Sequence, residues 1–160
     1  MKSKPFELSI SQWFNTKGAI TLEQLKGRVV VVGAFQMLCP ACVAHSIPQL
    51  KKMQTIFKNT QVVVIGLHTV FEHHAAMQPH ALEAFIHEYR LSFPIGIDRH
   101  TPDEAIPQTM QALNLRGTPS TVIFDTAGEI CFHEFGHVDD LVLGLTIGQL
   151  LSTANGSARA

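Results

Sequence analysis

Two cysteines three positions apart, Cys39 and Cys42, carry most of the chemical information in this sequence. A Cys-x-x-Cys spacing has two common uses, as half of a zinc site or as a dithiol that exchanges electrons with disulfides. The pair lies between an apolar run that predicts a strand, residues 28–35, and a predicted helix, residues 41–58. The start of a helix favours negative charge, so this position favours the reactive thiolate over the thiol.

The order of the two cysteines predicts their roles in disulfide exchange. Cys39 comes first and should be the more exposed, so we expect its thiolate to attack a substrate disulfide and form a mixed disulfide. Cys42 lies one turn inside the predicted helix, and we expect it to attack Cys39 and release the reduced substrate. Pro40 suits the first turn of a helix, where its missing N–H costs nothing.

Two other interpretations of the pair stay open at this point. A zinc site needs two further ligands, and Cys131 with the nearby His133 and His137 would make a mixed set. The pair would otherwise be two buried thiols without chemistry, since a free cysteine often serves as a small core residue. The position at the end of a buried strand favours the redox use.

A second motif lies far along the chain, where Arg116-Gly117-Thr118-Pro119-Ser120 precedes an apolar strand. The bond before a proline is the only peptide bond that commonly adopts the cis form. A proline directly ahead of a strand, with a glycine two residues earlier, suits a tight turn. On these residues alone, an ordinary trans turn at Pro119 is the expectation.

The apolar patterns predict strands that alternate with helices. Four β-branched residues in a row, from Val29 to Val32, are typical of a strand that is buried on both faces. Pro48 should kink the helix after the cysteine pair. The predicted strands are 28–35, 61–67, 93–97, 121–125 and 130–135, the last two forming a hairpin, and the predicted helices are 41–58, 81–89, 106–113 and 141–151, followed by a frayed tail from residue 155. This order predicts an α/β domain with a mixed sheet and helices on both faces.

Composition excludes several classes of protein. The chain has 160 residues, 46% of them hydrophobic, which argues against disorder and predicts a single domain. Twelve basic and thirteen acidic residues give a net charge of −1, too little positive charge for a nucleic-acid binder. No apolar stretch approaches the ~20 residues of a membrane span. The N-terminus lacks the features of a signal peptide, so we expect a cytoplasmic protein, or an extracytoplasmic one if a leader has been removed.

Together these features resemble the thioredoxin-fold thiol–disulfide oxidoreductases. Within them the sequence is most similar to the redoxin branch, which comprises the TlpA/ResA-like proteins and the related AhpC/TSA family. The resemblance covers about residues 15–150 of a single thioredoxin-like domain, 1–160. It is carried by residues 27–35 leading into the cysteine pair, by Pro48, by residues 93–98 and by residues 117–129.

The resemblance implies roles for several residues. Pro119 would be a cis-proline that faces the two sulfurs, and the backbone of Thr118 would pair with an incoming substrate chain as a short added strand. Leu38 and Pro40, on either side of Cys39, would also meet the substrate. The implied partners are protein thiols and disulfides and an electron donor or acceptor that the sequence does not identify, and no cofactor is implied.

The sequence departs from the family pattern at three positions. Leu38 stands where relatives often have Trp or Tyr, and His45 stands where many have Glu. Pro48 lies six residues after Cys42 instead of the usual five, which a one-residue insertion within residues 43–47 would explain. His45 is then either an exposed helix histidine or a group for thiol proton transfer, since imidazole titrates near neutral pH.

Two alternative functions remain beside disulfide exchange. A peroxidase of the peroxiredoxin type needs Pro-x-x-x-Thr-x-x-Cys, but Gln36 stands where the threonine before Cys39 would be. A metal-binding module would use the two thiols and nearby histidines. The candidates are the loop histidines of the predicted irregular segment 68–80: His68, His73, His74 and His80.

Overall fold

The computed structural model of the protein describes residues 4–158 and contains six strands and four α-helices. Three short helical turns, Glu23–Leu25, Cys42–Ser46 and His74–Ala76, lie between them. The strands are β1 (Ile10–Phe14), β2 (Val29–Phe35), β3 (Val62–His68), β4 (Ile95–Asp98), β5 (Ser120–Phe124) and β6 (Ile130–Phe135), and the helices are α1 (Ile47–Ile56), α2 (Pro79–Glu88), α3 (Gln108–Ala112) and α4 (Asp140–Ala158).

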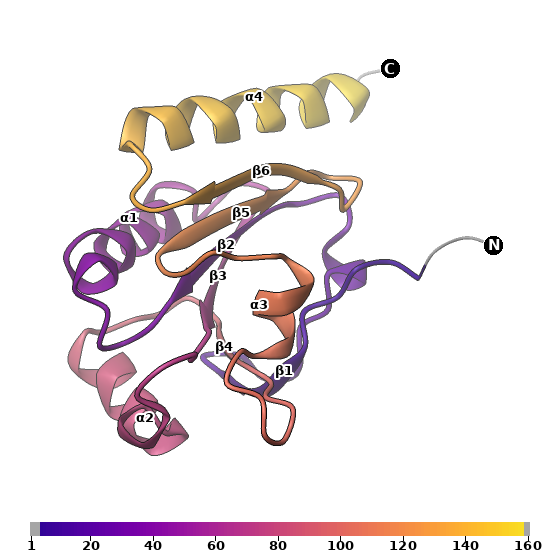
Figure 1. Cartoon of the computed structure of the whole chain (residues 1–160). Helices are drawn as coiled ribbons and strands as arrows, with labels where there is room; N and C mark the ends of the chain where they lie inside the picture. The colour runs from indigo at the N-terminus through magenta and orange to yellow at the C-terminus, as the bar shows by residue number, and fades with distance from the viewer. Residues whose placement is uncertain (1–3, 159–160) are drawn as a thin grey trace.

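The six strands form one mixed sheet in the order β1-β4-β3-β2-β5-β6 (Figure 1). Strands β2, β3 and β4 run parallel, whereas β1, β5 and β6 pair antiparallel to their neighbours. Strand β2 therefore lies inside the sheet, between β3 and β5. The predicted mixed sheet and the late hairpin of β5 and β6 are both confirmed.

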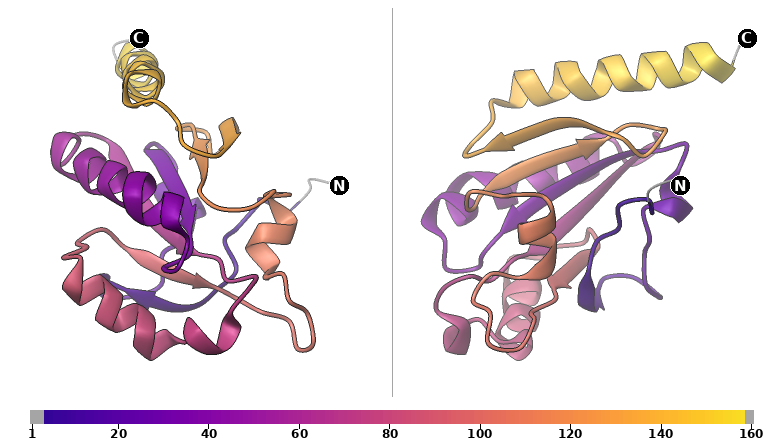
Figure 2. Two further views of the ribbon diagram at one scale, coloured as in Figure 1. Left: turned by 60° about the vertical axis from the view of Figure 1, so that its left-hand side comes forward. Right: turned by 45° about the vertical axis from the view of Figure 1, so that its right-hand side comes forward.

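Strand β2 is buried on both faces, as its unbroken β-branched run predicts. Val29, Val31 and Phe35 join one core cluster, and Val30 and Val32 join the other. Helices α1, α2 and α4 cover the first face, and α3 with the N-terminal segment covers the second (Figure 2). The predicted helices on both faces are confirmed, and the end of β2 is held rigidly where the cysteine pair begins.

The structured part of the chain extends beyond the predicted core of residues 15–150 at both ends. Strand β1 pairs with β4 at one edge of the sheet, and Phe6 stacks on the ring of Phe124. Helix α4 continues to Ala158, through the stretch predicted as a frayed tail. Sequence patterns miss these ends because β1 is an irregular edge strand with exposed polar residues, and because the glycines of α4 weaken its local helical signal.

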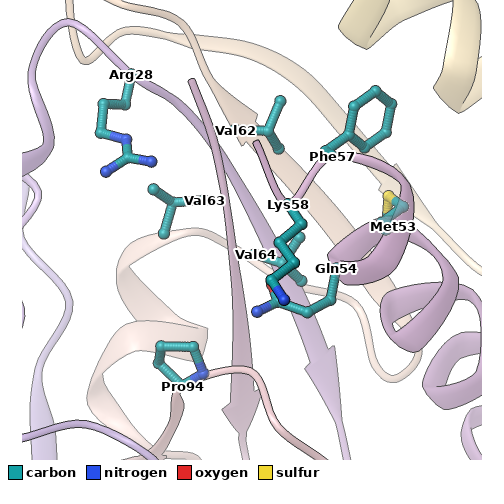
Figure 3. Close-up of a pocket in the computed structure, with 9 residues that line it drawn as sticks. All are labelled: Arg28, Met53, Gln54, Phe57, Lys58, Val62, Val63, Val64 and Pro94. Atoms are coloured by element: carbon teal, nitrogen blue, oxygen red, sulfur yellow. The ribbon is translucent and has the colours of Figure 1, made fainter. Parts of the chain in front are cut away.

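A hollow of about 230 Å³ lies between α1 and the starting ends of β2 and β3 (Figure 3). Arg28, Gln54 and Lys58 line it together with apolar side chains, and none of its lining residues is a cysteine, a histidine or an acidic residue. Parallel strands carry their following loops at the other end, where the cysteine pair lies. This hollow therefore has no part in the thiol chemistry.

Close packing around Gly66 of β3 predicts a clear effect of an added methyl group. A Cβ there would lie 2.9 Å from Phe93 Cε2, 3.1 Å from Ile95 Cγ1 and 3.2 Å from Phe35 Cε1. All three side chains are fully buried, so Gly66→Ala should lower the free energy of unfolding by about 1–3 kcal/mol. Gly148→Ala is the control, because that exposed helix position has open space and should gain up to about 1 kcal/mol. Urea denaturation of both variants measures this, and equal effects would contradict it.

Candidate active site

Cys39 lies in the short connection between the end of β2 and the helix that follows. Its N–H donates to the Gln36 carbonyl at 3.1 Å, and its own carbonyl accepts from Val43 N–H at 3.1 Å as the helix begins. Cys39 is partly exposed, whereas Cys42 is fully buried. The structure thus gives the two cysteines the difference in exposure that their order predicts.

The sulfur of Cys39 touches both motifs singled out in the sequence. It accepts a hydrogen bond from the Cys42 N–H at 3.2 Å and donates to the Thr118 carbonyl at 3.6 Å. Both cysteines are free thiols, so the structure is that of the dithiol form. A backbone N–H directed at the sulfur stabilises the charged thiolate, which suits Cys39 to be a nucleophile.

The turn around Pro119 lies against the cysteine pair, as the family resemblance implies. The Thr118–Pro119 peptide bond is cis. Pro119 is buried, and its carbonyl accepts from Gly136 N–H at 2.8 Å, which joins the turn to the end of β6. Two motifs about eighty residues apart in sequence therefore form one site.

Burial dominates the ionisation of Cys42. It raises the pKa of this thiol to about 12, and the neighbouring thiol of Cys39 acts in the same direction. Hydrogen bonds from the Gln36 backbone and the Thr118 side chain oppose this rise. At neutral pH Cys42 is therefore a thiol that must be deprotonated before it can attack.

A π-helical turn, Cys42–Ser46, connects Cys42 to helix α1. The Ile47 N–H donates to the Cys42 carbonyl five residues back, and Pro48 follows in the first turn of α1. A π-turn accommodates one extra residue in a helix, and Pro48 cannot supply an N–H to the regular pattern. The predicted single helix is thus divided where the one-residue insertion was expected.

The other expected site residues lie around the cysteine pair. Leu38 and Pro40 are exposed on either side of Cys39. His45 is exposed in the π-helical turn, with its ring 4.8 Å from that of His137. No hydrogen bond in the described part of the chain joins His45 to either sulfur, so its role in proton transfer stays a prediction.

His68 is a buried site residue that the sequence interpretation placed wrongly in a solvated loop. It ends β3, is 1% exposed and lies against the ring of Phe35. Its Nε2 accepts the Met37 N–H at 3.3 Å, so its proton resides on Nδ1. Burial, with a smaller contribution from His100, lowers the pKa of His68 to about 4. A neutral His68 thus anchors the loop that leads to Cys39.

Gln36 is the second site residue whose role the sequence did not reveal. It follows β2, is 1% exposed and points its amide at the hydroxyl of Thr118 at 3.4 Å. It occupies the place of the peroxidase threonine but is turned inward, so it offers no free donor for a peroxide. The peroxidase alternative is therefore not favoured. The sequence signal that could have revealed the role of Gln36 is its position, as a polar residue directly after a strand predicted to be buried on both faces.

Among the described residues, the structure shows no set of ligands for a zinc site or for a metal-binding module. Cys131 donates to the Ile123 carbonyl at 3.4 Å, which lies four residues along β5 from Pro119, roughly 13 Å in a strand. His133 contacts the Leu113 carbonyl instead of Cys131. Within residues 4–158, no three His, Cys, Asp or Glu side chains are grouped as metal ligands.

Acid should destabilise the protein through His68. Its pKa of about 4 lies below the ordinary 6.5, so between these values the unfolded chain binds a proton that the folded chain does not. The stability it contributes is full above pH 6.5 and is lost as the pH falls toward 4, by up to about 3 kcal/mol. His68→Gln keeps an acceptor for Met37, and should flatten the loss of unfolding free energy in urea titrations over this range. Parallel pH profiles for the two proteins would contradict this.

The comparison with protein families and curated proteins agrees with this geometry. The AhpC/TSA family model matches residues 2–133. The thiol-disulfide oxidoreductase ResA of Halalkalibacterium halodurans is 27% identical over 126 residues, which are 78% of this chain and 64% of that protein. NHL repeat-containing protein 2 of Gallus gallus is 27% identical over 144 residues, 85% of this chain and 18% of that protein. The chain thus spans less than two thirds of either curated relative.

Two solved structures are similar over almost their whole length. The thioredoxin-like superfamily protein SPOA0173 is 52% identical with a TM-score of 0.89, and the match covers 92% of this chain and 96% of that one. A thiol-disulfide isomerase from Corynebacterium glutamicum is 47% identical with a TM-score of 0.89, covering 94% and 97%. The chain therefore has a thioredoxin-like fold and belongs to the AhpC/TSA family.

Proposed function

We propose that this protein is a thiol–disulfide oxidoreductase that exchanges its Cys39–Cys42 dithiol with disulfides of protein substrates. The observation that carries the proposal is the position of the Cys39 sulfur. It is partly exposed and lies between the Cys42 N–H and the Thr118 carbonyl, beside the cis Thr118–Pro119 bond. The names of the two relatives that are called thiol-disulfide oxidoreductase and isomerase support the same activity.

In the first step, the Cys39 thiolate attacks one sulfur of a substrate disulfide. The Cys39–substrate bond forms as the substrate S–S bond breaks, and the departing sulfur leaves as a thiolate that takes a proton. Thr118 is partly exposed, and its backbone is suited to align the substrate chain by pairing with it, with Leu38 and Pro40 in contact with the same chain. Pro119 is the next residue of the same turn and is buried.

In the second step, Cys42 attacks the Cys39 sulfur of the mixed disulfide. The Cys39–Cys42 bond forms and the Cys39–substrate bond breaks, so the substrate leaves with both sulfurs reduced. Run in reverse, the same steps oxidise a substrate dithiol, and a partner of matching potential then restores the starting form.

The cellular location of the protein stays a prediction. No helix between residues 4 and 158 combines the length and apolarity that crossing a bilayer requires. The cytoplasmic and extracytoplasmic alternatives both accommodate the proposed chemistry, with a different electron partner in each.

Single cysteine variants test the assignment of roles. Cys39→Ser should abolish disulfide exchange, because the exposed nucleophile is lost. Cys42→Ser should instead accumulate a mixed disulfide with substrate, because the resolving thiol is lost. Mass spectrometry of non-reduced complexes with a disulfide-containing protein identifies the trapped species. Cys131→Ala is the control and should change exchange rates by no more than about threefold. Trapping by Cys39→Ser would overturn the assignment.

The second step should accelerate with pH through the neutral range. Burial, the largest cause of the raised pKa of Cys42, persists in the mixed disulfide, so the thiolate fraction should grow about tenfold for each pH unit as long as the pH lies below that pKa. The lifetime of the mixed disulfide should fall accordingly, as measured by rapid acid quenching between about pH 6 and pH 9. A lifetime that does not change with pH would show that Cys42 deprotonation does not limit the step.

A further inference from the structure

Helix α4 has an outer side that no other described element covers. Figure 2 shows it as the outermost element on its side of the molecule. Its inner side is buried through Leu143 and Ile147, which are 2% and 0% exposed. On the outer side, Leu141 is 82% exposed and Leu145 is 64% exposed. The helix is thus apolar on both sides, which is typical of a helix that is covered on both sides.

The outer side of α4 also carries no charge. No Asp, Glu, Lys, Arg or His occurs from residue 141 to residue 158. Helices that lie in the surface of a membrane carry Lys or Arg on their polar face, so α4 lacks their pattern. A partner that recognises charge finds nothing to bind on this side. The chemistry of the surface therefore suits an uncharged, apolar partner surface.

The shape of the outer side is complementary to itself. Leu141 and Leu145, four residues apart, form a ridge along the helix, and Gly144 and Gly148, also four apart, form a groove beside it. Outside its own stretch of helix, a Cβ added at either glycine would meet no atom within 4 Å, so the groove is open. Helices commonly pack by seating such four-residue ridges in the grooves of a neighbour. A second α4 supplies both the matching ridge and the matching groove.

Gly144 also borders a hollow between α1 and α4. Its volume is about 140 Å³, and its apolar lining comes from Met53, Ile56, Phe57 and Leu143. The polar side chains that line it already bond within the chain, because Asp140 accepts from Gln49 and Lys52. An apolar cavity of about 150 Å³ holds benzene, so this hollow has room for an aliphatic side chain.

We propose that the outer side of α4 is the docking surface for a second copy of this chain, with the two helices antiparallel about a twofold axis. Leu145 of one protomer lies over Gly144 of its partner, at the hollow, and Leu141 lies over Gly148. Each contact occurs twice, as an isologous dimer requires. The axis passes between residues 144 and 145, so the two Leu145 side chains are neighbours across it. This inference does not depend on the proposed function.

The contact of one helix pair predicts a dimer that depends on concentration. Helix α4 has 19 residues and is therefore about 28 Å long. Stable dimers bury about 1,200–2,000 Å² in total, and a single pair of helices lies at or below the lower end of this range. At low concentration the chain is monomeric, so the stability gain expected for Gly148→Ala is unaffected.

Sedimentation velocity from about 1 μM to about 1 mM protein measures this equilibrium. Reducing agent is present throughout, because the exposed Cys131 would otherwise link chains through a disulfide. The average mass should rise with concentration from that of one chain toward that of two. Leu145→Glu should raise the dissociation constant at least about tenfold, because it places two carboxylates against each other. Ile106→Glu is the matched control, since Ile106 is 46% exposed and lies outside α4, and it should leave the equilibrium unchanged.

Two further variants test the twofold arrangement. Leu145→Lys alone should stay monomeric like Leu145→Glu, but an equal mixture of the two should associate, because the axis brings opposite charges together. Gly144→Leu should also weaken the dimer at least about tenfold by filling the groove. Leucine favours the helix more than glycine does, so this loss would come from the contact and not from a weaker helix.

Several outcomes would overturn the inference. These are wild-type protein that stays monomeric to about 1 mM, a dimer that Leu145→Glu leaves intact, an equal effect of Ile106→Glu, or a mixture of the two charged variants that does not associate. Monomeric protein that sediments with phosphatidylcholine vesicles, and ceases to do so in Leu145→Glu, would assign the surface to a membrane instead. Circular dichroism verifies that each variant is folded, and a Leu145→Glu protein that does not fold leaves Gly144→Leu to decide.

Discussion

The complete burial of the Cys42 sulfur is the constraint on which the rest of the site depends. A thiolate formed there has no water to solvate it, so every stabilising donor must come from the protein. Contacts with the Gln36 backbone and the Thr118 side chain, at the end of β2 and in the turn before β5, lower the pKa of Cys42 against the effect of burial. The adjacent strands β2 and β5 bring these two segments together, and that pairing makes the site possible.

Polar contacts of Gln36 and Met37 hold the connection between β2 and Cys39. Gln36 contacts Thr118 and Phe71 through its side chain, and Met37 donates its N–H to His68. Because His68 is buried and neutral, this support is insensitive to pH through the neutral range. The contacts of Gln36 and Met37 therefore hold this connection in place while the cysteine pair changes its protonation and redox state.

The π-helical turn, Cys42–Ser46, allows both Cys42 and helix α1 to take their positions against the sheet. Cys42 lies one turn beyond Cys39 with its side chain fully buried, while α1 packs its apolar side against the sheet. One extra residue between Cys42 and Pro48 would shift the residues of α1 around the helix axis relative to Cys42. The π-helical turn accommodates this residue, because the Ile47 N–H donates to the Cys42 carbonyl five residues back. The same turn carries His45 outward to His137, away from the sulfurs.

The sequence by itself determined the strand of β2, the hairpin of β5 and β6 and the exposure order of Cys39 and Cys42. Each depends on local patterns, such as β-branched runs and the placement of a motif at a helix start. Only the tertiary structure decided the buried contacts of Gln36 and His68, whose partners Thr118 and Met37 lie 82 and 31 residues away. The sequence does not show whether water or a distant segment satisfies the hydrogen bonds of a polar side chain. The pairing of strands decides this, because it brings the distant segment close to the side chain.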